Sequence, residues 1–245
     1  MLGGLLECRG AFVKNCTVDD TCSVIVNTDY ETFDSLEYYV GGLVGHAKGK
    51  IIGCKNSGSV SGNAEHVGGI VGGADWGSLI KDCINYGEVR GFRGVGGIAG
   101  TVYGNTVSKC ENSGTVSGGD NVGGIAGFTA ESVVDCKNSG TIQGINISFG
   151  PDNRYGSSVG GIAGMLDNIT IGQTKEISGC ENSGDVKGSN QVGGIVGYTS
   201  GKTVECVNNG NISFEYGDSV GGIAGGSYLG ITDCKDNGTV NGETQ

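Results

Sequence analysis

The chain has 245 residues, of which 52 are glycine, ten are cysteine and one is proline, and its formal net charge at pH 7 is −11. Acidic residues are spread through the whole sequence, which argues against nucleic acid and against an anionic membrane surface as partners. No run of 18 or more apolar residues occurs, so the sequence predicts no membrane insertion.

Two short phrases recur in phase along the chain. Variants of Val-Gly-Gly-Ile-Ala-Gly begin at Val40, Val67, Val95, Val122, Val159, Val192 and Val220. Between them, Cys-x-Asn-x-Gly begins at Cys54, Cys83, Cys110, Cys136, Cys180 and Cys206, and at Cys234 with Asp236 in place of asparagine. Self-similarity at such a period indicates a solenoid, a propeller or a similar array.

The residue pattern of each repeat predicts short strands joined by corners. From Cys54 to Gly62, inward candidates alternate with polar residues, which is the two-residue period of a β-strand with one buried face. In the Val-Gly-Gly-Ile phrase the apolar residues are three apart, so we expect a bend at the glycine pair, where glycine tolerates a positive φ. We expect about three strands per repeat, and no window has helical periodicity.

These features predict an all-β fold, a parallel β-solenoid (β-helix) of about eight coils of 27–38 residues. Units of 27 or 28 residues are too short for propeller blades, and the lack of helix excludes leucine-rich and helical repeats. Residues 1–245 then form a single repeat domain. The precedent of other parallel strand connections favours a right-handed coil.

Stacking places equivalent residues of successive coils in columns. One column is a structural ladder of asparagines that satisfies its own amide groups, and another is a ladder of cysteines. The asparagines are Asn56, Asn85, Asn112, Asn138, Asn182 and Asn208, and the cysteines are Cys54, Cys83, Cys110, Cys136, Cys180, Cys206 and Cys234. The cysteines read either as a disulfide or metal framework or as small buried hydrophobes, and the parallel side chains favour the second reading. Cys16 occupies the same place in its repeat as these seven, and only Cys8 and Cys22 lie outside the column. The register is irregular around Cys8, Cys16 and Cys22, so a bridge or a metal site there is the exception left open.

Three insertions interrupt the basic period, at residues 23–39, 143–158 and 166–178. The first two fall on the same edge of the coil, and a smaller variation from Asn211 to Ser219 reaches that edge two coils beyond the second. Aromatic, acidic and amide side chains suit a sugar, so the candidate ligand-binding residues are Phe149, Asp152, Asn153, Arg154, Tyr155, Phe214, Glu215, Tyr216 and Asp218. The alternative is that these aromatic residues only pack the insertions onto the coil. Trp76, the single tryptophan, is either an exposed stacking platform or the cover of an apolar patch.

Catalysis is a second hypothesis. A β-helical enzyme that cuts polysaccharides would use paired carboxylates, and the candidates are Asp29 with Glu31, Asp34 with Glu37, and Asp152 beside Glu215. No spacing fixes their separation, so we predict no catalytic residue, no metal site and no cofactor. The two histidines, His46 and His66, do not form the zinc motif His-Glu-x-x-His.

The two recurring phrases resemble the GLUG repeat of bacterial surface proteins, most literally at Gly42-Leu43-Val44-Gly45. The resemblance covers nearly the whole chain. It implies an extracellular or cell-surface location and a non-enzymatic structural or adhesive role, with a host protein or a glycan as partner. An alternative is a spacer domain of a large secreted protease, such as the non-catalytic part of immunoglobulin A peptidases. We also expect the chain to be a segment of a longer surface protein, or to associate end to end with neighbouring repeats.

Overall fold

The computed structural model describes residues 5–26, 38–149, 152–155, 157–168, 173–215, 217 and 219–242. Every regular element within these ranges is a β-strand. Among the described residues there is accordingly no helix that is long and apolar enough to cross a membrane.

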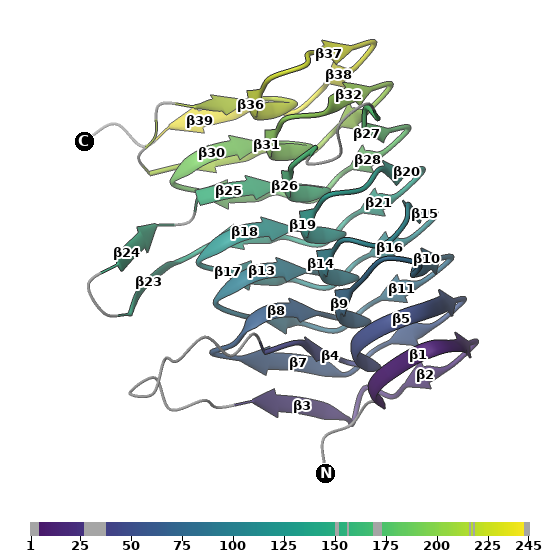
Figure 1. Ribbon diagram of the computed structural model, residues 1–245. Coiled ribbons are helices and arrows are strands. Elements are labelled where there is room, and N and C mark those ends of the chain that lie inside the picture. The colour runs from purple at the N-terminus through teal and green to yellow at the C-terminus, as the bar shows by residue number, and fades with distance from the viewer. Residues whose placement is uncertain are drawn as a thin grey trace.

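The strands stack into four parallel sheets that run the length of the molecule, plus one hairpin (Figure 1). Sheets B and C each contain eight strands, which confirms the expected parallel β-solenoid of about eight coils. The first row of sheet A comprises β1 (Leu5–Lys14), β5 (Val44–Ile52), β9 (Val71–Ala74), β14 (Ala99–Val102), β19 (Ala126–Thr129), β26 (Ala163–Leu166), β31 (Val196–Thr199) and β36 (Ala224–Ser227); its second row comprises β10 (Leu79–Lys81), β15 (Val107–Ser108), β20 (Val133–Val134), β27 (Glu176–Ser178), β32 (Lys202–Val204) and β37 (Ile231–Thr232). Sheet B comprises β2 (Thr17–Val18), β6 (Lys55–Asn56), β11 (Ile84–Asn85), β16 (Glu111–Asn112), β21 (Lys137–Asn138), β28 (Glu181–Asn182), β33 (Val207–Asn208) and β38 (Lys235–Asp236). Sheet C comprises β3 (Ser23–Val26), β7 (Ser59–Gly62), β12 (Val89–Arg90), β17 (Val116–Gly118), β22 (Ile142–Gly144), β29 (Val186–Gly188), β34 (Ile212–Phe214) and β39 (Val240–Gly242). Sheet D comprises β4 (Val40–Gly41), β8 (Glu65–Gly68), β13 (Arg93–Gly96), β18 (Asp120–Gly123), β25 (Ser157–Gly160), β30 (Asn190–Gly193) and β35 (Val220–Gly221), and the hairpin pairs β23 (Asn146–Phe149) with β24 (Asp152–Tyr155).

A plain coil contains five strands, so the expectation of about three was too low. From β14 the chain passes through β15, β16, β17 and β18 before it returns to the first row of sheet A. The alternating run that begins at Cys54 is two strands, β6 and β7, because a corner at Ser57 and Gly58 divides it. At this corner the Asn56 side chain accepts a hydrogen bond from the Gly58 amide and donates one to the Gly58 carbonyl oxygen.

The glycine pair of the Val-Gly-Gly-Ile phrase is needed for close packing and not for a positive φ, which corrects the sequence-based expectation. Neither Gly68 nor Gly69 has a positive φ. A Cβ atom at Gly68 would collide with the carbonyl oxygen of Val71, and one at Gly69 with the carbonyl oxygen of Gly97. The left-handed conformation occurs instead just before five of the seven phrases, for example at His66 and Asn121 (φ 55° and 51°).

The turn at the glycine pair also divides the interior into two cores. Val67 and Ile70 are both fully buried, as the sequence predicted. Val67 belongs to a column of valines and isoleucines between sheets C and D. Ile70 belongs to a larger cluster that includes the buried cysteines and both rows of sheet A. Each coil therefore contributes to two parallel apolar columns.

The asparagine ladder is present as expected. Each Nδ2 donates one hydrogen bond to the Oδ1 atom of the asparagine in the next coil, at 2.7–2.8 Å. The other hydrogen of each Nδ2 group is donated to a glycine carbonyl oxygen in the same coil, as from Asn112 to Gly114. The final member is Asp236, which accepts from Asn208 but has no amide hydrogen to donate further.

Six members of the cysteine column, from Cys54 to Cys206, are buried, and Cys234 is partly exposed. Their thiols are unbridged and donate weakly to backbone carbonyl oxygens, as from Cys136 to Val134. Burial raises the pKa of the Cys136 thiol well above its ordinary value. These cysteines therefore behave as small buried hydrophobes. Cys16, which the sequence placed in the same column, is exposed, as is Cys22.

Candidate functional site

Two insertions and the smaller variation leave the coil at the same corner, between sheets C and D, which we call the C–D edge. They connect β3 to β4, β22 to β25, and β34 to β35. Strand β22 pairs with β29, and β29 pairs with β34, so the second insertion and the variation are two coils apart. At about 4.8 Å per coil, their starting points are roughly 10 Å apart.

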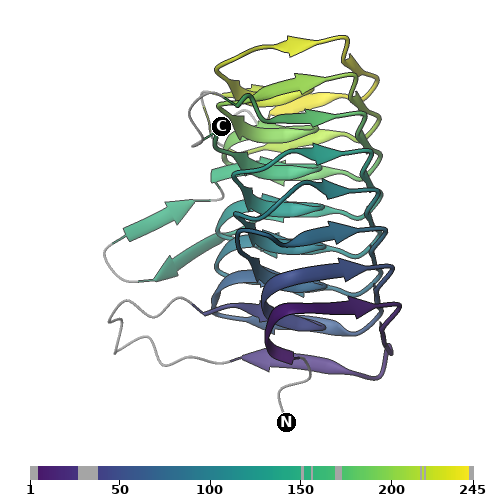
Figure 2. The ribbon, with the colours of Figure 1, turned by 45° about the vertical axis from the view of Figure 1, so that its right-hand side comes forward.

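The second insertion forms the hairpin of β23 and β24. Its register pairs Asn146 with Tyr155 and Phe149 with Asp152, and the hairpin extends away from the body of the solenoid (Figure 2). The predicted binding residues Phe149, Asp152, Asn153, Arg154 and Tyr155 all lie on these two strands. Their side chains are outside the described part of the structure, so their role as ligand contacts stays a prediction.

The variation after β34 is described only in part. Phe214 is half-buried and packs against the core between sheets C and D, which favours a packing role for this ring. The Glu215 carboxylate is exposed and lies 2.9 Å from the Lys187 ammonium group. Tyr216 and Asp218 lie outside the described residues, so the structure does not test them as ligand contacts.

At the C-terminal end of the first insertion the structure describes Tyr38 and Tyr39. Residues 27–37, which include Asp29, Glu31, Asp34 and Glu37, lie outside the described residues. The Tyr39 ring lies between the two histidines of the chain, with centroid distances of 4.6 Å to His46 and 4.8 Å to His66. Sequence reasoning missed this cluster. Tyr39 and His66 lie 27 residues apart, one repeat, just before Val40 and Val67, which pair in register, so the repeat spacing was a signal for the stacking of these two rings. His46 joins them from β5, and no repeat spacing connects it to them.

The His66 ring continues this cluster inward. Its Nδ1 atom is 2.5 Å from the Thr101 hydroxyl oxygen, and its Nε2 atom is 3.9 Å from the Glu65 carboxylate. A hydroxyl, an imidazole and a carboxylate in this order can activate a nucleophile. Thr101, however, is only 1 % exposed, so this contact orients the imidazole and presents no hydroxyl to a substrate.

The third insertion, after Leu166, leaves the coil at a different corner, as the sequence indicated. This corner joins the first and second rows of sheet A, and we call the column of turns there the A-turn edge. Lys175 anchors the insertion, because its ammonium group is 2.7 Å from the buried Glu131 carboxylate and its own side chain is mostly buried. The backbone amide of Glu176 also donates to the Ser132 hydroxyl oxygen of the coil below.

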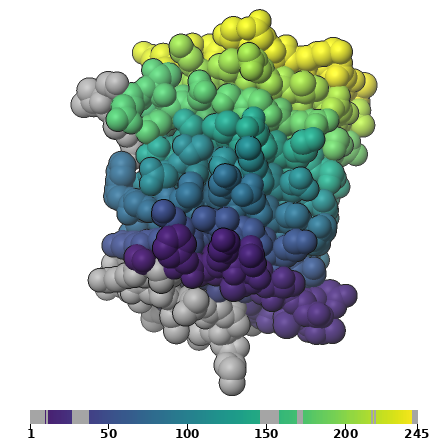
Figure 3. Space-filling model, turned by 90° about the vertical axis from the view of Figure 1, so that its right-hand side faces the viewer, coloured from purple at the N-terminus to yellow at the C-terminus, as the bar shows by residue number. Residues whose placement is uncertain are grey.

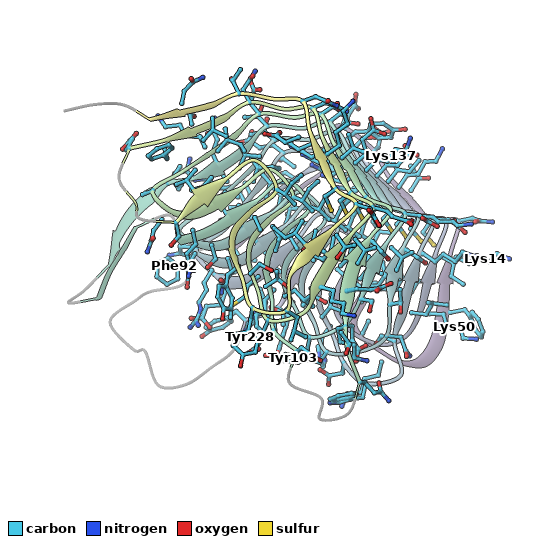
Figure 4. The ribbon with its side chains drawn as sticks, turned by 90° about the horizontal axis from the view of Figure 1, so that it is seen from above. Lys14, Lys50, Phe92, Tyr103, Lys137 and Tyr228 are labelled. Atoms are coloured by element: carbon cyan, nitrogen blue, oxygen red, sulfur yellow. The ribbon has the colours of Figure 1, made fainter. Side chains whose placement is uncertain are left out.

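The A-turn edge also carries aromatic side chains. Trp76 is 62 % exposed, which decides between the two interpretations of this residue in favour of an exposed ring. In the next coil, Tyr103 contacts Phe128 at a centroid distance of 5.5 Å. Viewed along the axis, Tyr103 and Tyr228 lie on one side of the solenoid, away from the hairpin (Figure 4). Within the described residues no cluster of three or more acidic, histidine or cysteine side chains could hold a metal ion.

A known sequence motif matches part of this repeat structure. A family model described as the GLUG motif matches residues 37–61, which include β4 and most of the first complete coil. The chain contains a GLUG motif. No curated protein matches the sequence. Among solved structures, the GLUG-containing chain is similar to a Bacteroides ovatus protein described as a "putative immunoglobulin A1 protease", with 15% sequence identity and a TM-score of 0.47. The match covers 92% of this chain and 74% of that one.

Proposed function

We propose that this GLUG-containing solenoid is a non-enzymatic structural and adhesive module of a bacterial cell-surface or secreted protein. In this role the stacked coils are a stiff scaffold, and the C–D edge binds a host protein or a glycan. The observation that supports this proposal is that the hairpin interrupts neither sheet C nor sheet D. Strand β22 pairs with β17 and β29, and β25 pairs with β18 and β30, in the same register as in plain coils.

Because both sheets continue past the hairpin, the hairpin is not needed to hold the coils together. In the coil below, one residue, Gly119, connects β17 to β18, whereas residues 145–156 connect β22 to β25. The twelve-residue segment is therefore additional surface that the scaffold does not need. Loops and hairpins on a repetitive scaffold are common locations for binding residues.

The test compares the complete chain with a variant in which one glycine replaces residues 145–156. Both proteins are applied to an array of glycans and host extracellular proteins. We expect a bound ligand for the complete chain, at least tenfold weaker binding for the variant, and unchanged circular dichroism. Lys137→Ala, on the exposed face of sheet B, is the matched control and is expected to bind normally (Figure 4). An array with no ligand would contradict the adhesive role, and equal binding of every ligand by both chains would contradict ligand binding at the C–D edge.

The non-enzymatic part of the proposal has its own test. The same glycans are incubated with the protein, and the release of shorter products is measured. We expect no turnover. Product release that disappears in Asp152→Asn would instead establish the polysaccharide-cleaving alternative.

A further inference from the structure

We infer that the Trp76 turn is a second binding site, on the A-turn edge, and that it takes the pyranose rings of a neutral glycan. The site consists of Trp76 and the neighbouring polar group of Asp75, His46 and Lys48, with Tyr103 in the next coil. It lies on a different side of the solenoid from the hairpin, so it does not depend on the function proposed for the C–D edge.

The first argument is that the exposed indole is held on a rigid turn. The Ser78 amide donates to the Asp75 carbonyl oxygen at 3.0 Å, and the Asp75 amide donates to the Ala47 carbonyl oxygen at 2.9 Å. The buried Ser78 hydroxyl donates to the same Ala47 oxygen at 2.8 Å. Gly77 closes the turn in the left-handed region, at φ 91°. Because the backbone of the turn is already fixed, only the side-chain torsions of Trp76 are left to be ordered when a ligand stacks on the ring.

The second argument is the polar group beside the ring. The Asp75 carboxylate lies 3.2 Å from His46 Nε2 and 3.2 Å from Lys48 Nζ. Burial opposes ionisation of Asp75, but the hydrogen bonds from His46 and Lys48 outweigh it and lower its pKa. A carboxylate has about four acceptor sites, so Asp75 can accept further hydrogen bonds from sugar hydroxyls while both contacts remain.

The third argument is that the next turn packs closely on the Trp76 turn and adds a second ring. Gly104 packs directly on the Asp75–Ser78 turn, where a Cβ atom would contact the Asp75 carbonyl oxygen. The Tyr103 amide donates to the Ala74 carbonyl oxygen at 2.7 Å, which fixes Tyr103 against the coil that carries Trp76. Two aromatic residues on adjacent coils can contact a chain of sugars along the axis.

The charges of the site favour a neutral ligand. The Lys48 ammonium group is already paired with Asp75, and the His46 imidazole contacts the same carboxylate. The whole chain carries a formal charge of −11, which repels anionic glycans at long range. A pyranose ring has an apolar face for the indole and hydroxyl groups for the carboxylate, and it needs no charge of its own.

The structure also supplies a matched control for this site. Following the strand register from Ala74 through successive coils leads to Ser227. Leu229 therefore occupies the same turn position as Trp76, and it too precedes a glycine with positive φ, Gly230 at 105°. Leu229 is exposed but lacks an equivalent of Asp75, since Tyr228 occupies that position.

The experiment uses intrinsic fluorescence, because Trp76 is the only tryptophan in the chain. The complete chain is titrated with hexaoses of glucose, xylose, mannose and N-acetylglucosamine, and binding is measured in parallel by calorimetry. We expect at least one hexaose to change the Trp76 emission. Asp75→Asn, which keeps the fluorophore, should weaken binding at least tenfold, Trp76→Ala should abolish the heat of binding, and Leu229→Ala should bind as the unmodified chain does.

Three results would overturn the inference: no response to any of the four hexaoses at millimolar concentration, binding that survives Trp76→Ala, or capture of a protein by the Trp76 turn without any glycan binding. Circular dichroism of each variant establishes that it is folded. The chain without residues 145–156 should keep the fluorescence response, so failure at the C–D edge and failure at Trp76 are distinguishable.

Discussion

At the scale of single residues, the solenoid depends on positions where only one residue type fits. The asparagines use both amide hydrogens and the side-chain oxygen, so each one satisfies its own coil and a neighbouring one. The paired glycines admit backbone atoms of the next coil where any side chain would collide. Both requirements come from the stacking of coils, and they explain why these two phrases repeat.

Asn112→Ala removes one member of the ladder. The Asn85 amide loses its acceptor and the Asn138 oxygen loses its donor, and both groups remain buried. We expect the free energy of unfolding to fall by roughly 2–4 kcal/mol, measured by urea denaturation. Ser113→Ala, one residue away and exposed, should change it by less than about 0.5 kcal/mol. Equal effects of the two substitutions would contradict the role of the ladder.

Gly97→Ala tests the close approach of neighbouring coils. The new Cβ atom would meet the Gly124 carbonyl oxygen and the Asn112 side chain, and the carbonyl is backbone that cannot move aside. We expect a loss of roughly 3 kcal/mol or more, or a failure to fold. At Gly226 the nearest atom to a new Cβ is in the Tyr198 ring, at 2.9 Å, which can rotate. Gly226→Ala should therefore cost less than about 1 kcal/mol, and a cost as large as that of Gly97→Ala would be inconsistent with this explanation.

At the scale of elements, the insertions differ in how they join the scaffold. The hairpin of β23 and β24 pairs only with itself, whereas the insertion after Leu166 is fixed by a buried ion pair. A two-stranded hairpin is marginally stable alone, so the hairpin is the part of the chain most suited to be ordered by a ligand. The third insertion is instead attached to the coil and forms part of the A-turn edge.

Lys175→Met tests this anchoring. The substitution leaves the Glu131 carboxylate buried without its cation, which we expect to cost about 3–5 kcal/mol. In the double variant with Glu131→Leu, much of the stability should return, because no unpaired charge remains buried. Chemical denaturation of the single and double variants measures both values. A double variant as unstable as Lys175→Met would show that the carboxylate is not the source of the loss.

At the scale of the whole molecule, each coil contacts only nearby coils, so stability varies along the axis. Successive coils form consecutive bands from the N-terminal to the C-terminal end (Figure 3). Ile231 and Val240 in the last coil are 44 % and 43 % exposed, whereas their equivalents in the preceding coils are buried. Such an array opens from a less covered end more easily than from its middle.

The cysteine column can be used to measure how stability varies along the axis, since it places one thiol in each of seven successive coils. In the native protein iodoacetamide should label Cys16 and Cys22, which are exposed, and leave Cys54 to Cys206 unmodified. With increasing urea, Cys234 and Cys206 should become labelled before Cys110 and Cys136, as measured by peptide mass spectrometry. Labelling of all the buried thiols at one urea concentration would instead show a single cooperative unit.

The sequence by itself determined the solenoid, the number of coils, the asparagine ladder and the buried cysteine column. These are properties of a repeated pattern, because identical phrases in register must occupy identical positions. Only the tertiary structure decided the number of strands per coil, the division into two cores and the true role of the glycine pair, since each depends on backbone contacts between coils. It also brought Tyr39 between His46 and His66 and left Trp76 exposed beside Asp75. Tyr39 lies one repeat before His66, and Trp76 directly follows Asp75. The ring contacts and the exposure of the indole, however, depend on how the side chains pack, which residue spacing does not fix.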